Sequence, residues 1–330
     1  MSRLDSWVVV LFSASLLAAC GGNGSGSGGG GAGGSTSSGG TAGTTSSSGG
    51  TGGSVVLHGG CPTAEQVGYF YVEHEIDYSV VSGEVLDGVV PSKILFEVGK
   101  EGDCTLWQRK NPFCNPACAP NQACAQDGTC VPYPLPQDAG QVTIAGLTKP
   151  VSMTYPNYYD TTVDHPPFTP GAAVTLEAKG ATIPAFTLYG EGFAPMVIPA
   201  DKLVLKKGEP LAVSWTKDDS ATVATVRVRV NVDQHGTSPV ELICELSDTG
   251  STMIPASLVD QLISFGVTGF PSLHVIRHTL DSADTGKGCV QFEVYSHRLA
   301  DFQVADHLPC DAATPCPVGY TCDIPTGTCK

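Results

Sequence analysis

Alternation of apolar and polar residues dominates the chain beyond residue 61. It is clearest at 225–232, where Val226, Val228, Val230 and Val232 alternate with Thr225, Arg227, Arg229 and Asn231. At 240–246 Val240, Leu242, Cys244 and Leu246 alternate with Glu241 and Glu245. A period of two places successive side chains on opposite faces of a strand. The two stretches therefore predict strands with one buried face, and Asp233-Gln234-His235-Gly236 predicts the turn between them.

Weaker strand patterns fill the rest of residues 138–306. They are Val142 with Ile144, Val174 with Leu176, Leu203 with Leu205, Val213 with Trp215, Leu273 to Leu280, and Val290, Phe292 and Val294. Short strands separated by turn residues predict an all-β sandwich body. Their order resembles an immunoglobulin-like β-sandwich. Trp215 departs from that family, because it precedes Cys244 and Cys289 instead of lying between them.

Residues 55–113 predict a β-rich N-terminal region. Phe70, Val72, His74, Ile76 and Tyr78 alternate with Glu73, Glu75 and Asp77, and residues 93–98 form a second strand pattern after Pro91. His74 falls on the apolar face, so we expect a hydrogen-bonded core or edge histidine. Glu73 and Glu75 point away from it, which excludes a metal site shared with His74. Whether this region packs with residues 138–306 stays open.

A possible catalytic motif follows the strand at 240–246. Asp248-Thr249-Gly250-Ser251 resembles the signature of pepsin-like aspartic proteases, in which two carboxylates share a proton. The residues before Asp248 are not apolar as that family requires, and Asp284-Thr285-Gly286 leads into a Lys-Gly turn. We favour a turn followed by a short helix with Pro255 at its first position, Leu258, Val259, Leu262 and Ile263 as its buried stripe, and Gly266 at its end. An aspartic peptidase that uses Asp248 is the alternative.

Two segments each carry four closely spaced cysteines. They are residues 114–132, with Cys114, Cys118, Cys124 and Cys130, and residues 310–330, with Cys310, Cys316, Cys322 and Cys329. Both are poor in apolar residues and need covalent crosslinks. They resemble the C-terminal half of EGF-like modules. The spacing favours first-to-third and second-to-fourth pairing, but four cysteines permit three connectivities. A zinc site at Cys114 and Cys118 is the rival interpretation.

Four further cysteines lie in the two β regions. Cys61 and Cys104 flank the N-terminal strands and are our candidates for one disulfide. Cys244 and Cys289 would then pair by elimination. Cys289, however, shares strand parity with Gln291 and Glu293, whereas Cys244 lies on an apolar face. A position at the start of its strand would reconcile Cys289 with this pairing.

The N-terminus consists of Arg3 and an uncharged run from Trp7 to Ala19, which is too short for a permanent transmembrane helix. The run ends in Leu17-Ala18-Ala19-Cys20, which resembles the lipobox of bacterial lipoproteins. The resemblance implies a signal peptide at 1–19 and a lipid on Cys20. Gly21, in place of an Asp retention signal, implies the outer membrane of a Gram-negative envelope, facing either the periplasm or the medium. An ordinary secretory signal that leaves Cys20 free is the alternative.

Residues 20–54 are almost entirely Gly, Ser, Thr and Ala after the cysteine. This composition predicts a flexible linker, with a root-mean-square reach of roughly 30 Å. No Gly-Lys-Ser or Gly-Lys-Thr follows the glycines, so they do not predict a phosphate-binding loop. The folded part is thus expected to be tethered at a distance from the membrane.

The overall composition restricts the classes of binding partner and indicates the redox compartment. The chain has a net charge of −15 and 17 Lys and Arg residues among 330, which disfavours nucleic acid. Lipidation of Cys20 would leave twelve of the thirteen cysteines, an even number that predicts six disulfides in an oxidising compartment. The sequence lacks the Gly-x-Ser-x-Gly motif of hydrolases.

The remaining candidate sites are weak. His274 and His278 share a strand face and could hold a metal, but packing is the simpler role. Asp160, Asp164, Asp281 and Asp284 lie in polar loops without the spacing of a calcium loop. Tyr155, Tyr158 and Tyr159 are expected to be exposed and indicate a glycan or protein contact surface, with packing over the edge of the sandwich as the alternative.

These observations predict a lipid-anchored, non-catalytic binding or adhesion module of the cell envelope. We expect no cofactor and no resident metal. The ligand would be an unidentified protein or glycan. A Ca²⁺-dependent glycan-binding protein is the second alternative, beside the aspartic peptidase.

Overall fold

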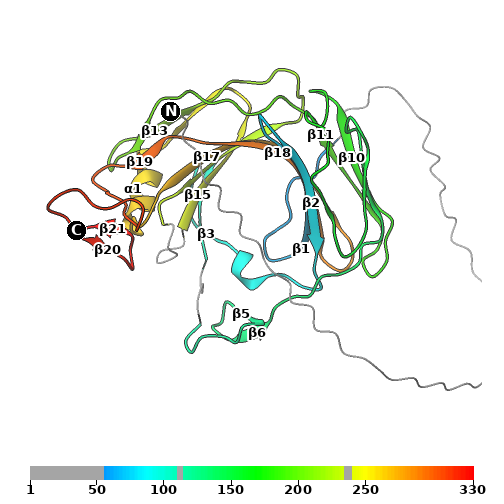
Figure 1. Ribbon diagram of the computed structural model, residues 1–330, viewed down its shortest axis with the longest axis horizontal. Helices are drawn as coiled ribbons and strands as arrows, with labels where there is room; N and C mark the ends of the chain where they lie inside the picture. The colour runs from blue at the N-terminus through cyan, green and yellow to red at the C-terminus, as the bar shows by residue number, and fades with distance from the viewer. Residues whose placement is uncertain (1–55, 110–113, 234–239) are drawn as a thin grey trace, which may run out of the picture. The chain divides into compact units, whose positions relative to one another are not determined.

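A nine-stranded mixed sheet runs through the protein (Figure 1). Its order is β3 (Phe96–Glu101), β4 (Cys104–Gln108), β15 (Val240–Ser247), β14 (Thr225–Asn231), β17 (Ser272–Asp284), β18 (Cys289–Leu299), β1 (Gln66–His74), β2 (Ser79–Val85) and β9 (Tyr159–Asp160). Neighbouring strands are antiparallel except β1 and β18, which are parallel. The strands before residue 109 and those after residue 225 therefore share one sheet.

The computed structural model describes residues 56–109, 114–233 and 240–330. These residues belong to one unit, Gly53–Lys330. The predicted signal peptide, Cys20, the linker to residue 54 and most of the turn at 233–236 lie outside the described residues. Within the described residues no helix has the length and apolarity needed to cross a membrane.

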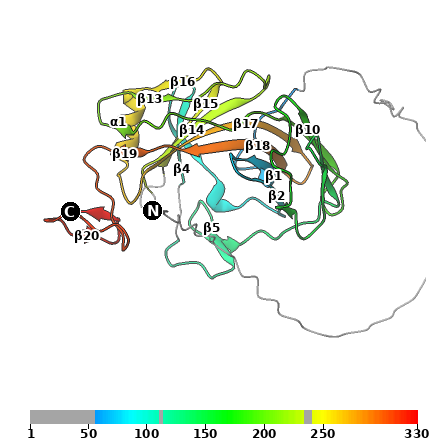
Figure 2. The same cartoon turned by 45° about the horizontal axis from the view of Figure 1, so that its top comes forward.

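One face of the large sheet is buried in two separate cores, because its apolar side chains recur at every second residue. The first core lies between β1, β18 and a four-stranded sheet, whose order is β11 (Phe186–Glu191), β10 (Ala173–Ala178), β7 (Val142–Ala145) and β8 (Val151–Met153). Phe70, Phe292 and Leu176 are fully buried there. Two packed sheets form the predicted sandwich, and Figure 2 shows β10 beside β1 and β2.

The second core covers β14, β15 and the start of β17. It is closed by the helix α1 (Ala256–Ser264) and by two small sheets, β12 (Leu203–Leu205) with β19 (Phe302–Val304) and β13 (Leu211–Ser214) with β16 (Ser251–Ile254). Val228, Leu242 and Leu262 meet in this core. Full burial of such a side chain stabilises the folded state by roughly 1.5–3 kcal/mol. Both cores pack against the same face of the large sheet.

The predicted helix is confirmed, with a short strand ahead of it. Pro255 is the residue before α1, and Leu258, Val259 and Leu262 are buried. Ile263 packs against the same core from a partly buried position. Gly266 follows the helix at a φ of 106°, a conformation that favours glycine.

The two cysteine modules are small disulfide-linked hairpins. The first contains β5 (Gln122–Cys124) and β6 (Cys130–Pro132), and the second contains β20 (Cys322–Asp323) and β21 (Thr328–Cys329). The disulfides are Cys114–Cys124, Cys118–Cys130, Cys310–Cys322 and Cys316–Cys329. Both modules therefore use first-to-third and second-to-fourth pairing. A short 3-10 helix, η1 (Pro91–Lys93), precedes β3.

The other two predicted disulfides are wrong. The structure pairs Cys61 with Cys289 and Cys104 with Cys244. Cys104 and Cys244 lie directly opposite each other on adjacent strands and are buried on the same face. Cys289 does start its strand, but its parity places it on the opposite face, where the segment around Cys61 crosses the sheet. The parity conflict in the sequence was the signal for this exchange.

One predicted strand ends earlier than expected. The alternating pattern predicted a strand from Phe70 to Tyr78, but residues 75–78 form a turn between β1 and β2. In this turn the Glu75 N–H donates to the Tyr78 carbonyl at 3.0 Å. Ile76 is therefore 61% exposed. Glu75 was expected on a wet face and is instead buried, because the turn directs it back toward β18.

The predicted class is confirmed: the fold is all-β, with sandwiched sheets and small disulfide-rich modules. The parallel neighbours β1 and β18 are a feature that the immunoglobulin-like strand order did not predict.

Candidate ligand-binding face

The face of the large sheet opposite its two cores carries polar and aromatic side chains. We call it the polar face. Residues directly opposite one another across the strands share it, as the pairs Trp107 with Glu241, Arg227 with Glu245, Arg229 with His274, Ile276 with His297, and Tyr71 with Glu293 show. The period of two that buried the valines of β14 therefore gathers these groups on one surface.

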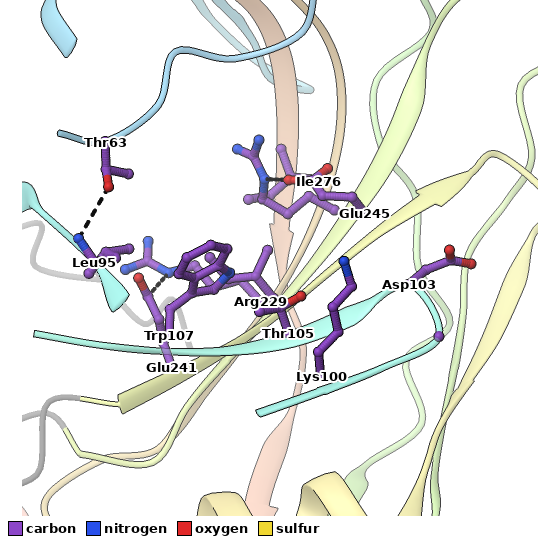
Figure 3. A pocket seen from close by; sticks show the side chains of 13 residues that line it. Thr63, Leu95, Lys100, Asp103, Thr105, Trp107, Arg229, Glu241, Glu245 and Ile276 are labelled. Atoms are coloured by element: carbon purple, nitrogen blue, oxygen red, sulfur yellow. Dashed lines mark hydrogen bonds and ion pairs between the residues drawn. The ribbon is translucent and has the colours of Figure 1, made fainter. Parts of the chain in front are cut away.

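Two adjoining cavities open on the polar face. The first has a volume of about 560 Å³ and the second about 760 Å³, and both are lined by Thr63, Arg227 and Glu245. Volumes of roughly 300–1,000 Å³ are typical of small-molecule sites. Figure 3 shows the Trp107 ring in the first cavity next to Arg229 and Glu241.

Opposite charges balance in the first cavity. Its lining contains three cations, Lys100, Arg227 and Arg229, and three anions, Asp103, Glu241 and Glu245. Arg229 Nε donates to Glu241 Oε2 at 2.6 Å and Arg227 Nε donates to Glu245 Oε1 at 2.5 Å. These pairs fix the donors and acceptors in place before any ligand arrives.

A network around the buried His278, which lines the second cavity, shares Arg227 and the exposed Glu245 with the first cavity. His278 Nε2 lies 3.1 Å from Glu245 Oε2, and its Nδ1 lies 2.9 Å from Glu293 Oε1. Arg227 Nη1 also donates to Glu293 Oε1, at 2.9 Å. Burial opposes ionisation of Glu293, but His278 and Arg227 outweigh it and lower the pKa of Glu293 to about 2. The same neighbours lower the pKa of Glu245 against its burial.

The structure places His274 and His278 in different surroundings. Burial and the Arg227 charge would lower the pKa of His278, but the two glutamates raise it. His274 instead stacks near His297, with ring centroids 5.7 Å apart, and its pKa is lowered by burial and by His297. The two histidines thus contact different partners on the same face.

Asp248, the candidate catalytic residue, lies on the other side of the sheet in a structural network. Its Oδ2 accepts a hydrogen bond from Arg277 Nε at 2.8 Å, and its Oδ1 accepts one from Trp215 Nε1 at 2.7 Å. Arg277 is 1% exposed and also donates to the carbonyls of Ala194 and Thr216. The arrangement joins β17 to the loop after β13. The Asp218 N–H also donates to Asp248 Oδ2, at 3.2 Å, and the Asp248 carboxylate is paired with the Arg277 guanidinium.

The four aspartates that were expected in polar loops do not gather. That expectation is wrong for Asp281 and Asp284, which lie on β17, and for Asp160, which ends β9. Asp160 accepts hydrogen bonds from Thr162 two residues on, and Asp284 accepts one from the Gly286 N–H. Asp281 is buried, where it accepts from the N–H groups of His58 and Tyr189. Asp164 joins none of these contacts. These are turn and packing interactions, and none of the four aspartates belongs to a group with metal-site spacing among the described residues.

Of the three tyrosines, Tyr155 and Tyr159 are exposed. Tyr158 was expected to be exposed and is 4% exposed instead, because its hydroxyl accepts from the Ala139 N–H and donates to the Gly140 carbonyl. This burial raises the pKa of Tyr158 to about 12.

Among the described residues, three groups have the composition and spacing of a metal site. Two are cysteine groups within the small modules, and their sulfurs are already joined in disulfides. Zinc at Cys114 and Cys118 is therefore not supported. The third group is Glu73, Glu75 and His297.

The sequence showed the arginines and glutamates of β14 and β15 as polar strand positions and assigned them no role. Trp107 was missed altogether. Trp107 and Thr105 flank the buried Leu106 and therefore lie on the opposite face of the strand, and this alternation was the signal that could have identified Trp107. A scan against models of known protein families and a search of curated proteins found no match for this chain.

Proposed function

We propose that the protein is a lipid-anchored, non-catalytic binding module of the cell envelope whose ligand site is the polar face. The observation that carries the proposal is Trp107 in the wall of a cavity of about 560 Å³ beside fixed pairs of opposite charge. The ligand class that fits best is a neutral glycan.

The glycan assignment follows from complementarity. An indole ring offers a flat apolar surface for the C–H face of a sugar ring. Sugar hydroxyls both donate and accept hydrogen bonds, which matches the alternating guanidinium and carboxylate groups of Arg229 and Glu241. Equal numbers of cations and anions in the lining favour a ligand without net charge.

The state of the carboxylates disfavours general acid catalysis, which supports the non-catalytic part of the proposal. General acid catalysis needs a group whose pKa lies near the working pH. The pKa values of Glu245 and Glu293 are lowered, so both are ionised at neutral pH and already bound to Arg227 and His278. Asp248 is likewise held by Arg277.

A glycan array followed by fluorescence titration tests the proposal. Binding of a neutral oligosaccharide should change the emission of Trp107. Trp107→Ala should weaken binding, measured by calorimetry, at least tenfold while far-ultraviolet circular dichroism stays native. Tyr189→Ala, an exposed aromatic on β11, is the matched control and should bind normally. Binding that survives Trp107→Ala, or that needs added Ca²⁺, would reject this site.

The anchor is tested separately. Cys20→Ser should move the protein from the membrane fraction to the soluble fraction, because stable attachment needs the acyl chains. Protease shaving of intact cells, with detection of peptides from residues 138–306, then separates the two orientations. Release indicates a surface module, and protection until the envelope is opened indicates a periplasmic one.

A further inference from the structure

The group of Glu73, Glu75 and His297, at the end of the polar face, contains two carboxylates and is therefore unlike an ordinary ion pair. Glu73 of β1, Glu75 in the following turn and His297 of β18 bring one ligand atom each within 4.8 Å of one another. The side chains of Glu73 and Glu75 are 13% and 5% exposed. Two buried carboxylates so close together repel each other unless a cation lies between them.

The described neighbours compensate for one carboxylate better than for the other. Glu75 is paired with Arg298 and accepts from the His297 N–H at 2.8 Å. Glu73 Oε1 accepts a neutral hydrogen bond from the Tyr78 hydroxyl at 2.8 Å. Its nearest charged partner is His297 Nδ1, 3.7 Å away. Among the described residues, Glu75 therefore contacts a guanidinium, whereas Glu73 contacts the neutral hydroxyls of Tyr78 and Tyr295 and the more distant His297 ring.

The spacing suits a small metal ion. His297 Nδ1 lies 2.9 Å from Glu75 Oε1 and 3.7 Å from Glu73 Oε1. Two ligands of a tetrahedral zinc ion, each about 2.0–2.1 Å from it, lie roughly 3.3 Å apart, between these two distances. His297 Nδ1 is buried and makes no hydrogen bond of good geometry. The His297 side chain is 34% exposed, which leaves a path from solvent.

We propose that Glu73, Glu75 and His297 form a binding site for a divalent transition metal, with Zn²⁺ as the reference ion. One imidazole nitrogen and two carboxylate oxygens match zinc and leave a fourth position open. Ca²⁺ prefers six to eight oxygen ligands, so an imidazole disfavours it. Tyr78 and Arg298 hold the carboxylates from outside, as supporting hydrogen bonds do in metal sites.

Zinc binding to the whole protein tests the site. The metal-free protein, purified in detergent without a polyhistidine tag, is titrated with Zn²⁺ by calorimetry, and the bound metal is counted by mass spectrometry. We expect one ion per chain. His297→Gln and Glu73→Gln should each weaken binding at least tenfold. His307→Gln and Glu177→Gln, which change the same residue types away from the site, should leave it unchanged.

Tyr78→Phe guards against a folding artefact, because it removes one hydroxyl from a partly exposed side chain. It should weaken zinc binding by about 10–100-fold, as loss of a supporting hydrogen bond does. Co²⁺ in place of Zn²⁺ should give visible absorption bands that vanish in His297→Gln. Absence of zinc binding, binding that survives both site variants, or tighter binding of Ca²⁺ than of Zn²⁺ would overturn the proposal. If no zinc binds, a proton on His297 supplies the positive charge next to Glu73 and Glu75.

Discussion

Asp248 is the residue whose replacement best separates a structural role from a catalytic one. Its carboxylate lies 2.8 Å from Arg277 Nε, and the two side chains are 8% and 1% exposed. Asp248→Asn keeps the size of the side chain and removes its charge. The buried guanidinium of Arg277 then loses the carboxylate with which it is hydrogen-bonded. Breaking a buried pair in this way costs about 3–5 kcal/mol of unfolding free energy.

Urea denaturation with the disulfides intact measures this cost. The double variant Asp248→Asn with Arg277→Met should recover part of the loss, because no unpaired charge remains. Glu209→Gln is the control, since it breaks a solvent-exposed pair with Lys206 and should leave the stability nearly unchanged. An Asp248→Asn protein no less stable than this control would refute the reasoning. Loss of a peptidase activity in a stable Asp248→Asn protein would establish the catalytic alternative.

Three further predictions test other parts of the fold. The pKa of Glu293 is lowered from 4.5 to about 2, so its stabilisation is present above pH 4.5 and is lost as pH falls toward 2. The upper bound of this stabilisation is about 3 kcal/mol. The difference in urea midpoint between wild type and Glu293→Gln should shrink from pH 6 to pH 3. A difference that stays constant over this range would contradict the ion-pair network of Glu293. Gly83→Ala places a methyl group 2.0 Å from the Phe70 ring and should destabilise by about 1–3 kcal/mol, whereas Gly88→Ala meets nothing closer than 3.8 Å and should be neutral. Peptide mapping without reduction should yield a linked Cys61–Cys289 pair, and a Cys61–Cys104 peptide would contradict the structure.

Local pattern predicted most strands because burial of one face imposes a period of two. The strand predicted at 225–232 matches β14, which ends one residue before the buried Val232, and the strand at 240–246 lies within β15. The helix stripe at Leu258, Val259 and Leu262 is buried as expected. The same pattern failed at residues 75–78, because apolar residues continued by chance through a turn that exposes Ile76.

The candidate site was harder to predict, because it is assembled from strands far apart in the chain. Trp107, Arg229 and Glu241 meet only when β4, β15 and β14 are neighbours. Glu73 and His297 meet through the parallel pairing of β1 with β18. No local spacing encodes either contact.

The sequence by itself determined the all-β class, the short helix and the two cysteine modules, since each depends on neighbours within a few residues or on composition. The tertiary structure decided which cysteines pair across the sheet, which charges are buried together and which face remains open. Those outcomes depend on strand order and register. A change of neighbour would separate Cys104 from Cys244 and Arg227 from Glu293, although every strand kept its own pattern.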